Sequence, residues 1–245
     1  MDTPPRWLRR ARPLLGTLVE IGVAEGTPPG VIEAAFAAIT LVQRRMSRFE
    51  PASDIALFNA ARNGTVLPVH RQTAAVLALA QQLQHESKGL FDASQGRPHA
   101  WRIEGLRLRK SDPRVQLDLG GIAKGYAVDR AVDTLRGSGV AHGWVNAGGD
   151  LRAFGSASLP VAVRDEAHGG ARPFGRLGDG AFATSHYGAG SRARLHTQDR
   201  SEALAHVSVA APECVWADAL TKVVALAHDP SHPLLAAHGG IAWLH

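Results

Sequence analysis

Residues 117–130 read LDLGGIAKGYAVDR, and this stretch decides how the rest of the chain is interpreted. Its first residues are typical of a short strand, Gly120 and Gly121 of a tight turn, and the amphipathic run through Leu135 of a helix. Glycines in such a turn let the backbone approach a ligand closely, and the free N–H groups of a first helical turn favour an anion. Lys124 adds a positive charge beside the turn. The stretch predicts an anion-binding corner, although a well-packed strand-to-helix turn with a surface lysine explains the same residues.

Further short motifs stand at intervals along the chain. They are Leu15-Gly16-Thr17, Met46-Ser47-Arg48-Phe49, Ser53-Asp54-Ile55 with Asn59, Gly89-Leu90-Phe91-Asp92-Ala93-Ser94, Asn146-Ala147-Gly148-Gly149-Asp150-Leu151-Arg152, Ala183-Thr184-Ser185 and Ala217-Asp218-Ala219-Leu220-Thr221. With the 117–130 stretch they resemble, in the same order, the motifs of the ApbE family, the FAD:protein FMN transferases. The resemblance runs from Leu14 to Leu226, and several motifs in register are more specific than any one of them.

The length and composition indicate a globular protein with a sizeable core. The chain has 245 residues, of which 45% are hydrophobic and 20% charged. We expect one domain over 14–245, or two interleaved lobes, after a basic N-terminal extension over 1–13. The formal net charge is +5. Because no basic stripe is interleaved with aromatic residues, we expect no nucleic-acid partner.

The cysteine content and the N-terminus bear on the compartment. Cys214 is the one cysteine, so no internal disulfide forms, and we expect a buried structural thiol. Residues 1–13 contain no apolar segment of signal-peptide length, and no run is long enough to span a membrane. Many ApbE relatives are exported lipoproteins, but no lipobox cysteine stands near the start. We expect a cytoplasmic protein, or a periplasmic one if an export segment has been removed.

Hydrophobic periodicity predicts a mixture of helices and strands. Helices are expected over 31–46, 53–60, 73–84, from the Gly120-Gly121 turn to about 135, and 213–227. Strands are expected over 14–23, 106–108, 115–119, 144–147, 151–154, 160–164, 206–211 and 241–244, and a further short strand is expected to end at Val69. Residues 91–101 are expected to be irregular. Since strands and helices do not alternate regularly, we predict an α+β fold. The family resemblance implies sheets flanked by helices around a central flavin-nucleotide cleft.

The resemblance also implies a reaction. FMN passes from FAD to a Thr or Ser hydroxyl of an acceptor flavoprotein, and AMP leaves. Such chemistry uses a dication on the phosphate oxygens, N–H or cationic donors for developing charge, and a base for the hydroxyl. Members of the family hold Mg²⁺ through an aspartate, a threonine four residues later and a backbone carbonyl. The aspartate maps to Asp218 and the carbonyl to Ala127.

The threonine of that metal set is displaced in this chain. Lys222 stands four residues after Asp218, and the threonine comes one step early, at Thr221. On a helix the positions i+3 and i+4 lie on the same side as i. Either Thr221 reaches the metal, or the ammonium of Lys222 takes the place of the cation. The alternative is a plain surface ion pair of Asp218 with Lys222.

His196 and Asp199 are the candidates for the base. They match the first part of a family segment, His-x-x-Asp-Pro-Arg-Thr-Gly, but Arg200 and Ser201 depart from the rest of it. Histidine accepts a proton near neutral pH, and an aspartate can orient it. A polar, solvated loop is the alternative for both residues.

Flavin contacts are carried over from the family position by position. The matching residues are Leu15, Phe49, Leu90, Phe91, Asp92, Gly120, Gly121, Lys124 and Arg130. Phe49 suits stacking on a flat ring system, and ordinary core packing is the alternative for Phe49 and Phe91. Asp92 is equally suited to a cap or turn. Asp150 could orient Lys124 or Arg152, although a simple turn aspartate would look the same.

The motifs and their departures from the family pattern leave two main functions open. The first is a Mg²⁺-dependent FAD:protein FMN transferase. The second is a degenerate ApbE paralogue that binds, or slowly hydrolyses, FAD without transferring FMN, because the departures at Lys222 and after Asp199 fall on the expected chemical groups. A protein that has lost the flavin pocket and serves only as an interaction partner is a third reading.

Overall fold

The structure is a computed structural model that describes residues 6–165, 168–187 and 206–245. The helices are α1 (Pro29–Met46), α2 (Asp54–Ala60), α3 (Arg71–Glu86), α4 (Ala123–Gly137), α5 (Cys214–Ala227) and α6 (Pro233–Ala237). The strands are β1 (Trp7–Leu14), β2 (Thr17–Ala24), β3 (Val66–Pro68), β4 (Trp101–Glu104), β5 (Arg107–Lys110), β6 (Gly143–Ala147), β7 (Asp150–Phe154), β8 (Leu159–Arg164), β9 (Ala171–Leu177), β10 (Gly180–His186), β11 (His206–Ala211) and β12 (Ile241–Leu244). The predicted α+β class is confirmed.

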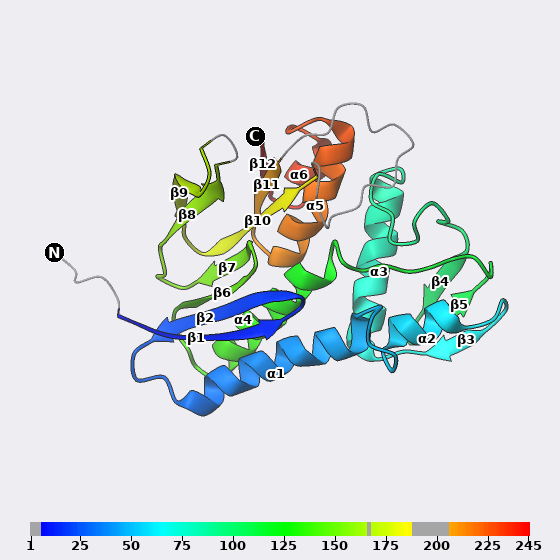
Figure 1. Ribbon diagram of the computed structural model, residues 1–245, viewed down its shortest axis with the longest axis horizontal. Helices are drawn as coiled ribbons and strands as arrows, with labels where there is room; N and C mark the ends of the chain where they lie inside the picture. Colours follow the sequence, from blue (N-terminus) through cyan, green and yellow to red (C-terminus); the bar gives the residue numbers. More distant parts are fainter. Residues whose placement is uncertain (1–5, 166–167, 188–205) are drawn as a thin grey trace.

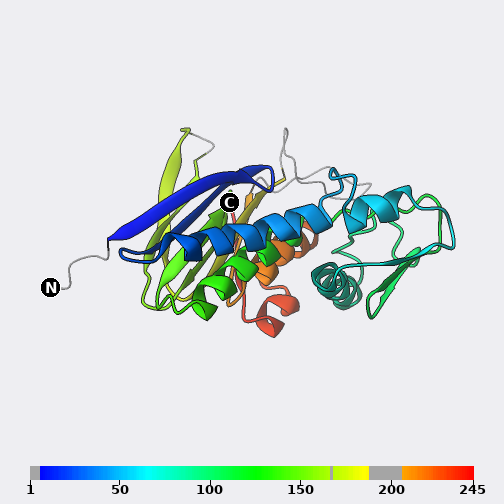
Figure 2. The same cartoon turned by 90° about the horizontal axis from the view of Figure 1, so that it is seen from below.

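The larger lobe is built on a seven-stranded sheet. Its strand order is β1-β2-β6-β7-β10-β11-β12, and every neighbouring pair is antiparallel. The helices α4 and α5 pack against its central strands, and α1 packs against α4 (Figures 1 and 2). The buried face of α1 is the one that its periodicity predicts, with Ile32, Ala35, Phe36, Ile39, Val42 and Met46 inside.

The smaller lobe lies at the far end of α1 (Figure 1). It holds α2, α3 and a three-stranded antiparallel sheet of order β3-β5-β4. Ser53 caps α2 as expected, since its side chain accepts the Ala56 N–H at 2.9 Å. The long helix α1 therefore joins the two lobes, and the cleft described below opens between them.

Two expectations about strands are wrong. The first is the basic extension expected over 1–13, because residues 7–14 form strand β1, which pairs along its whole length with β2 at the edge of the large sheet. Its arginines stay exposed, because an edge strand can keep one face in water. Residues 115–119 form no strand. The side chain of Asn59 takes the place of a neighbouring strand, accepting the Leu117 N–H at 2.7 Å and donating to the Leu117 carbonyl at 3.0 Å.

Candidate functional site

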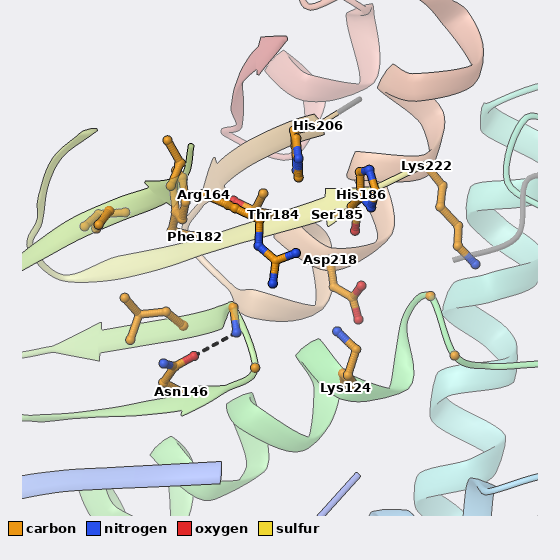
Figure 3. A pocket seen from close by; sticks show the side chains of 18 of the residues that line it. Lys124, Asn146, Arg164, Phe182, Thr184, Ser185, His186, His206, Asp218 and Lys222 are labelled. Atoms are coloured by element: carbon orange, nitrogen blue, oxygen red, sulfur yellow. Dashed lines mark hydrogen bonds between the residues drawn. The ribbon is translucent and has the colours of Figure 1, made fainter. Parts of the chain in front are cut away.

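A cleft of about 800 Å³ lies where the start of α4 meets α5, the β6–β7 turn and strands β8, β10 and β11. Polar and charged side chains from these elements point into it (Figure 3). They include Lys124, Asn146, Arg164, Thr184, Ser185, His186, His206, Asp218 and Lys222, and the smaller lobe adds Arg48, Asp92 and Gln95. The volume lies in the range of small-molecule and cofactor sites.

The glycine corner of the 117–130 stretch forms one wall. Asp118 accepts the Gly120 N–H at 2.9 Å and pairs with Arg48 at 3.3 Å, which fixes the turn from the side of the smaller lobe. Helix α4 then begins at Ala123 without a side-chain cap from its own Ncap residue. Backbone N–H groups at its start therefore need a partner from elsewhere in the fold.

Helices α4 and α5 supply those partners to each other. Asp218 on α5 accepts the Gly125 N–H of α4 at 3.0 Å. In return Asp129 on α4 accepts the N–H groups of Cys214 and Val215, the first residues of α5, at 2.9 and 2.8 Å. Each carboxylate also faces the positive end of the other helix dipole. The two helices are thereby fixed in the register that brings Asp218 to the glycine corner.

Gly125 is what allows this approach. A Cβ atom there would stand 2.2 Å from the Cys214 carbonyl oxygen and 2.9 Å from the Asp218 Cβ. Only a glycine lets the backbone of α4 come this close to α5. The expectation that the glycine corner and Asp218 share one cleft is confirmed.

Lys124 is held by a buried carboxylate. Its Nζ lies 2.5 Å from Asp150 Oδ2, as the expectation for Asp150 proposed, and Figure 3 shows Lys124 and Asp218 pointing toward one another. Burial alone would lower the pKa of Lys124, but the carboxylates of Asp150 and Asp218 outweigh it and raise that pKa. Burial and the Asp218 charge raise the pKa of Asp150 above its ordinary value. Lys124 therefore stays a cation at the floor of the cleft.

Thr221 is engaged in internal hydrogen bonds. Its hydroxyl donates to the Asp218 carbonyl oxygen at 2.7 Å and lies 2.9 Å from Ser185 Oγ and 3.0 Å from the Tyr187 hydroxyl. Thr221 is fully buried and does not belong to the described lining of the cleft. Its hydroxyl ties α5 to β10 and the residue after it.

Lys222 does line the cleft. Its Nζ lies over Gly121, where an added Cβ would be only 2.0 Å from that nitrogen, and 5.7 Å from the centre of the Phe91 ring. Burial lowers the pKa of Lys222, opposed by the charges of Asp218 and Asp118. The surface-pair alternative is wrong, because Asp218 is buried, at 3% exposure, and makes no ion pair with Lys222 among the described residues.

These donors do not fit the Mg²⁺ set that the resemblance implies. One Asp218 oxygen accepts a backbone N–H, the Thr221 hydroxyl is engaged, and Ala127 lies inside α4, where a carbonyl accepts the N–H four residues on. Lys222 presents an ammonium where an oxygen is needed. Within the residues that the structure describes, no group of three His, Cys, Asp or Glu residues could hold a metal.

Several expected flavin contacts lie outside the described lining of the main cleft. Arg130 pairs with Asp133 at 2.6 Å and stacks on the Tyr126 ring on another side of α4. Leu15 occupies the β1–β2 turn, and its N–H donates to the side chain of Gln43. Arg130 lies away from the cleft because a helix turns 100° per residue, so Arg130 and Lys124 face different sides of α4.

The aromatic and neighbouring candidates divide between core and surface. Phe91 is buried, whereas Phe49 is 80% exposed beside a smaller hollow that shares Arg48 and Gln95 with the cleft. Leu90 packs partly buried against the core. Asp92 lines the cleft, but its carboxylate organises its own loop by accepting from Gln84, Ser94 and Gly96. His196 and Asp199 lie outside the residues that the structure describes.

Two histidines on the opposite wall were not among the residues expected at the site. His186 on β10 and His206 on β11 are cross-strand partners, and their rings stack with centroids 4.5 Å apart. Both line the cleft (Figure 3). His206 begins a strand that was expected, whereas β10, which ends at His186, does not alternate in burial and was not among the expected strands.

Comparisons with known proteins identify the family of the chain and show its fold in solved structures. The model of the ApbE family matches residues 15–105 and 94–244. The chain belongs to the ApbE family. Solved ApbE structures share its fold: TM-scores are 0.78 for the apo flavinyl transferase of Pseudomonas stutzeri, at 22% identity, and 0.85 for the flavin transferase of Vibrio cholerae, at 20%. The Pseudomonas stutzeri match covers 92% of this chain and 86% of that structure. The Vibrio cholerae match covers 98% of this chain and 94% of that structure.

Two curated ApbE relatives carry the name FAD:protein FMN transferase. The protein from Rhodobacter capsulatus is 27% identical over 277 residues, covering 93% of this chain and 53% of the relative. That from Vibrio cholerae is 25% identical over 190 residues, covering 63% and 56%. The chain thus spans about half the length of the curated relatives it matches. No helix in the described ranges combines the length and hydropathy of a membrane span.

Proposed function

We propose that this chain binds FAD in the cleft and transfers its FMN part to a Thr or Ser hydroxyl of an acceptor flavoprotein. The observation that carries the proposal is the meeting of the glycine corner with Asp218 and Lys124 in one cleft of cofactor size. A helix N-terminus with adjacent lysines suits a diphosphate. The names of the curated relatives supply the reaction class.

The transfer is a displacement at phosphorus. The acceptor hydroxyl oxygen forms a bond to the phosphorus that carries riboflavin, and the bond from that phosphorus to the oxygen of the AMP phosphate breaks. The hydroxyl proton passes to a base, for which His196, oriented by Asp199, remains the proposal, and AMP leaves. Lys124 and the backbone N–H groups of the corner would stabilise the charge that develops on the phosphate oxygens.

Mass spectrometry of an acceptor protein tests the proposal. The chain is incubated with FAD and an acceptor of the family, once with Mg²⁺ and once with EDTA, since Mg²⁺ dependence is an implication of the resemblance. We expect an FMN-sized mass gain that disappears when the acceptor Thr or Ser is replaced by Val. Asp218→Asn should abolish the gain, because the start of α4 loses its carboxylate. A wild-type chain that binds FAD and yet adds no mass under either condition would contradict the transfer.

The second candidate function is FAD binding, or slow hydrolysis, without transfer. It is favoured by Lys222, which replaces an oxygen ligand of the family, and by the internal hydrogen bonds of Thr221. A purified protein that is yellow, carries bound FAD and leaves the acceptor mass unchanged would support this function instead.

A further inference from the structure

Lys222 is an ammonium group in the cleft that the carboxylates of Asp218 and Asp118 influence only through their charge, without a direct ion pair among the described residues. It makes no hydrogen bond or ion pair with any residue in the described part of the chain, whereas Lys124, on the facing helix, is held by Asp150. Its contacts are the backbone of Gly121 and the face of the Phe91 ring. A buried charge without a direct ion pair costs free energy, and an anion that enters the cleft would lower this cost by pairing with the ammonium.

The surroundings of Lys222 indicate where that anion sits. Asp218 precedes Lys222 by one helical turn, but an oxygen of its carboxylate already accepts the Gly125 N–H at the start of α4. Gly121 leaves the ammonium in contact with the turn, since no side chain intervenes. An anionic oxygen at this point would meet the ammonium of Lys222 from one side and the N-terminal end of α4 from the other.

We propose that Lys222 binds a phosphate oxygen of the dinucleotide directly and supplies there the positive charge for which the family uses a divalent cation. The inference rests on the proposed FAD site. It follows that this chain holds the diphosphate without Mg²⁺. The charge is built into α5, one turn after Asp218, rather than recruited from solution.

Ligand binding, rather than turnover, tests this inference. FAD, ADP and riboflavin are titrated into the full chain in EDTA and again in Mg²⁺. We expect FAD and ADP to bind in EDTA with affinities that Mg²⁺ changes by less than about threefold. Lys222→Met should weaken both by about tenfold to a hundredfold, the value of a hydrogen bond between charged groups, and leave riboflavin binding unchanged. Lys222→Thr, which restores the family's threonine position, should make FAD binding depend on Mg²⁺.

Arg102→Met is the matched control, because it removes one positive charge from an exposed side chain of β4. It should leave all three affinities unchanged, and thermal unfolding checks that each variant is folded. The inference is overturned if wild-type FAD binding is lost in EDTA and restored by Mg²⁺, or if Lys222→Met binds FAD like the wild type. Those results bear only on whether Lys222 takes the place of Mg²⁺. The proposed FMN transfer fails separately if the chain binds FAD in EDTA but adds no mass to the acceptor.

Discussion

Asp129 and Asp218 each close the N-terminus of the helix that carries the other. Asp129, on α4, accepts the Cys214 and Val215 N–H groups, and Asp218, on α5, accepts the Gly125 N–H. The exchange explains why two helices more than 75 residues apart in the sequence meet at a fixed register. The placement of Lys124, Asp218 and Lys222 in the cleft depends on that register.

Asp129→Asn tests whether the Asp129 carboxylate at the start of α5 stabilises the protein. Arg152 donates to Asp129 at 2.6 Å and both are buried, so the variant leaves a buried guanidinium without its charge partner. We expect the free energy of unfolding, measured with urea, to fall by about 3–5 kcal/mol. Asp133→Asn on the same helix is the control. Its pair with Arg130 is exposed, so a loss below about 1 kcal/mol is expected. Equal losses in the two variants would contradict the capping role.

Gly125→Ala tests the close approach of the helices. Its methyl group would overlap the Cys214 carbonyl, a backbone atom that cannot move without shifting α5. We expect a loss of about 1–3 kcal/mol or more in the free energy of unfolding, together with weaker FAD binding. Gly137→Ala is the matched substitution at the other end of α4, where a Cβ meets open space. It should stabilise the protein by about 0.5–1 kcal/mol. A Gly125→Ala variant as stable as the wild type would show that α4 and α5 are not in close contact.

Gly121→Ala separates ligand binding from stability. The added methyl group would displace only the end of the flexible Lys222 side chain, so thermal unfolding should change little. The affinity for FAD in EDTA should nevertheless fall by about tenfold, because the ammonium loses its position beside the turn. Isothermal titration with FAD and with riboflavin measures this. A drop in riboflavin affinity of the same size would point to a general distortion of the cleft instead.

His245 gives a pH-dependent contribution to stability. Its Nδ1 lies 3.1 Å from an Arg172 nitrogen and its Nε2 lies 3.1 Å from Ser208 Oγ, an arrangement that suits a neutral ring. Burial, Arg172 and His206 lower the pKa of His245 below 6.5. The native state therefore binds fewer protons than the unfolded state just below that pH, so this contribution is present above 6.5 and is lost as the pH falls.

His245→Gln should remove that loss, because glutamine does not titrate. Urea unfolding of both proteins between about pH 5 and 8 measures the difference in the free energy of unfolding. The difference should be constant above pH 7 and shrink toward acid pH as the wild type loses stability. A difference that stays constant over the whole range would mean that the pKa of His245 is not lowered in the native state.

Local patterns were enough for much of the fold. The apolar spacing of α1, the serine cap of α2 and the glycine turn before α4 lie within a few residues of one another, so the sequence shows them directly. The expectations for residues 7–14 and 115–119 are wrong for the opposite reason. Whether an extended segment belongs to a sheet depends on its neighbour, and for Leu117 that neighbour is the Asn59 side chain.

The amino-acid sequence by itself determined the family, the helix-forming segments and the presence of a lysine where a ligand oxygen is expected. Only the tertiary structure decided that Asp218 closes α4, that Thr221 is engaged inside the protein and that Lys222 lies over Gly121 without an ion pair in the described residues. The physical reason is distance along the chain. Helix periodicity reports which residues share a face, but the partner of a charge is chosen by how two helices far apart in sequence pack together.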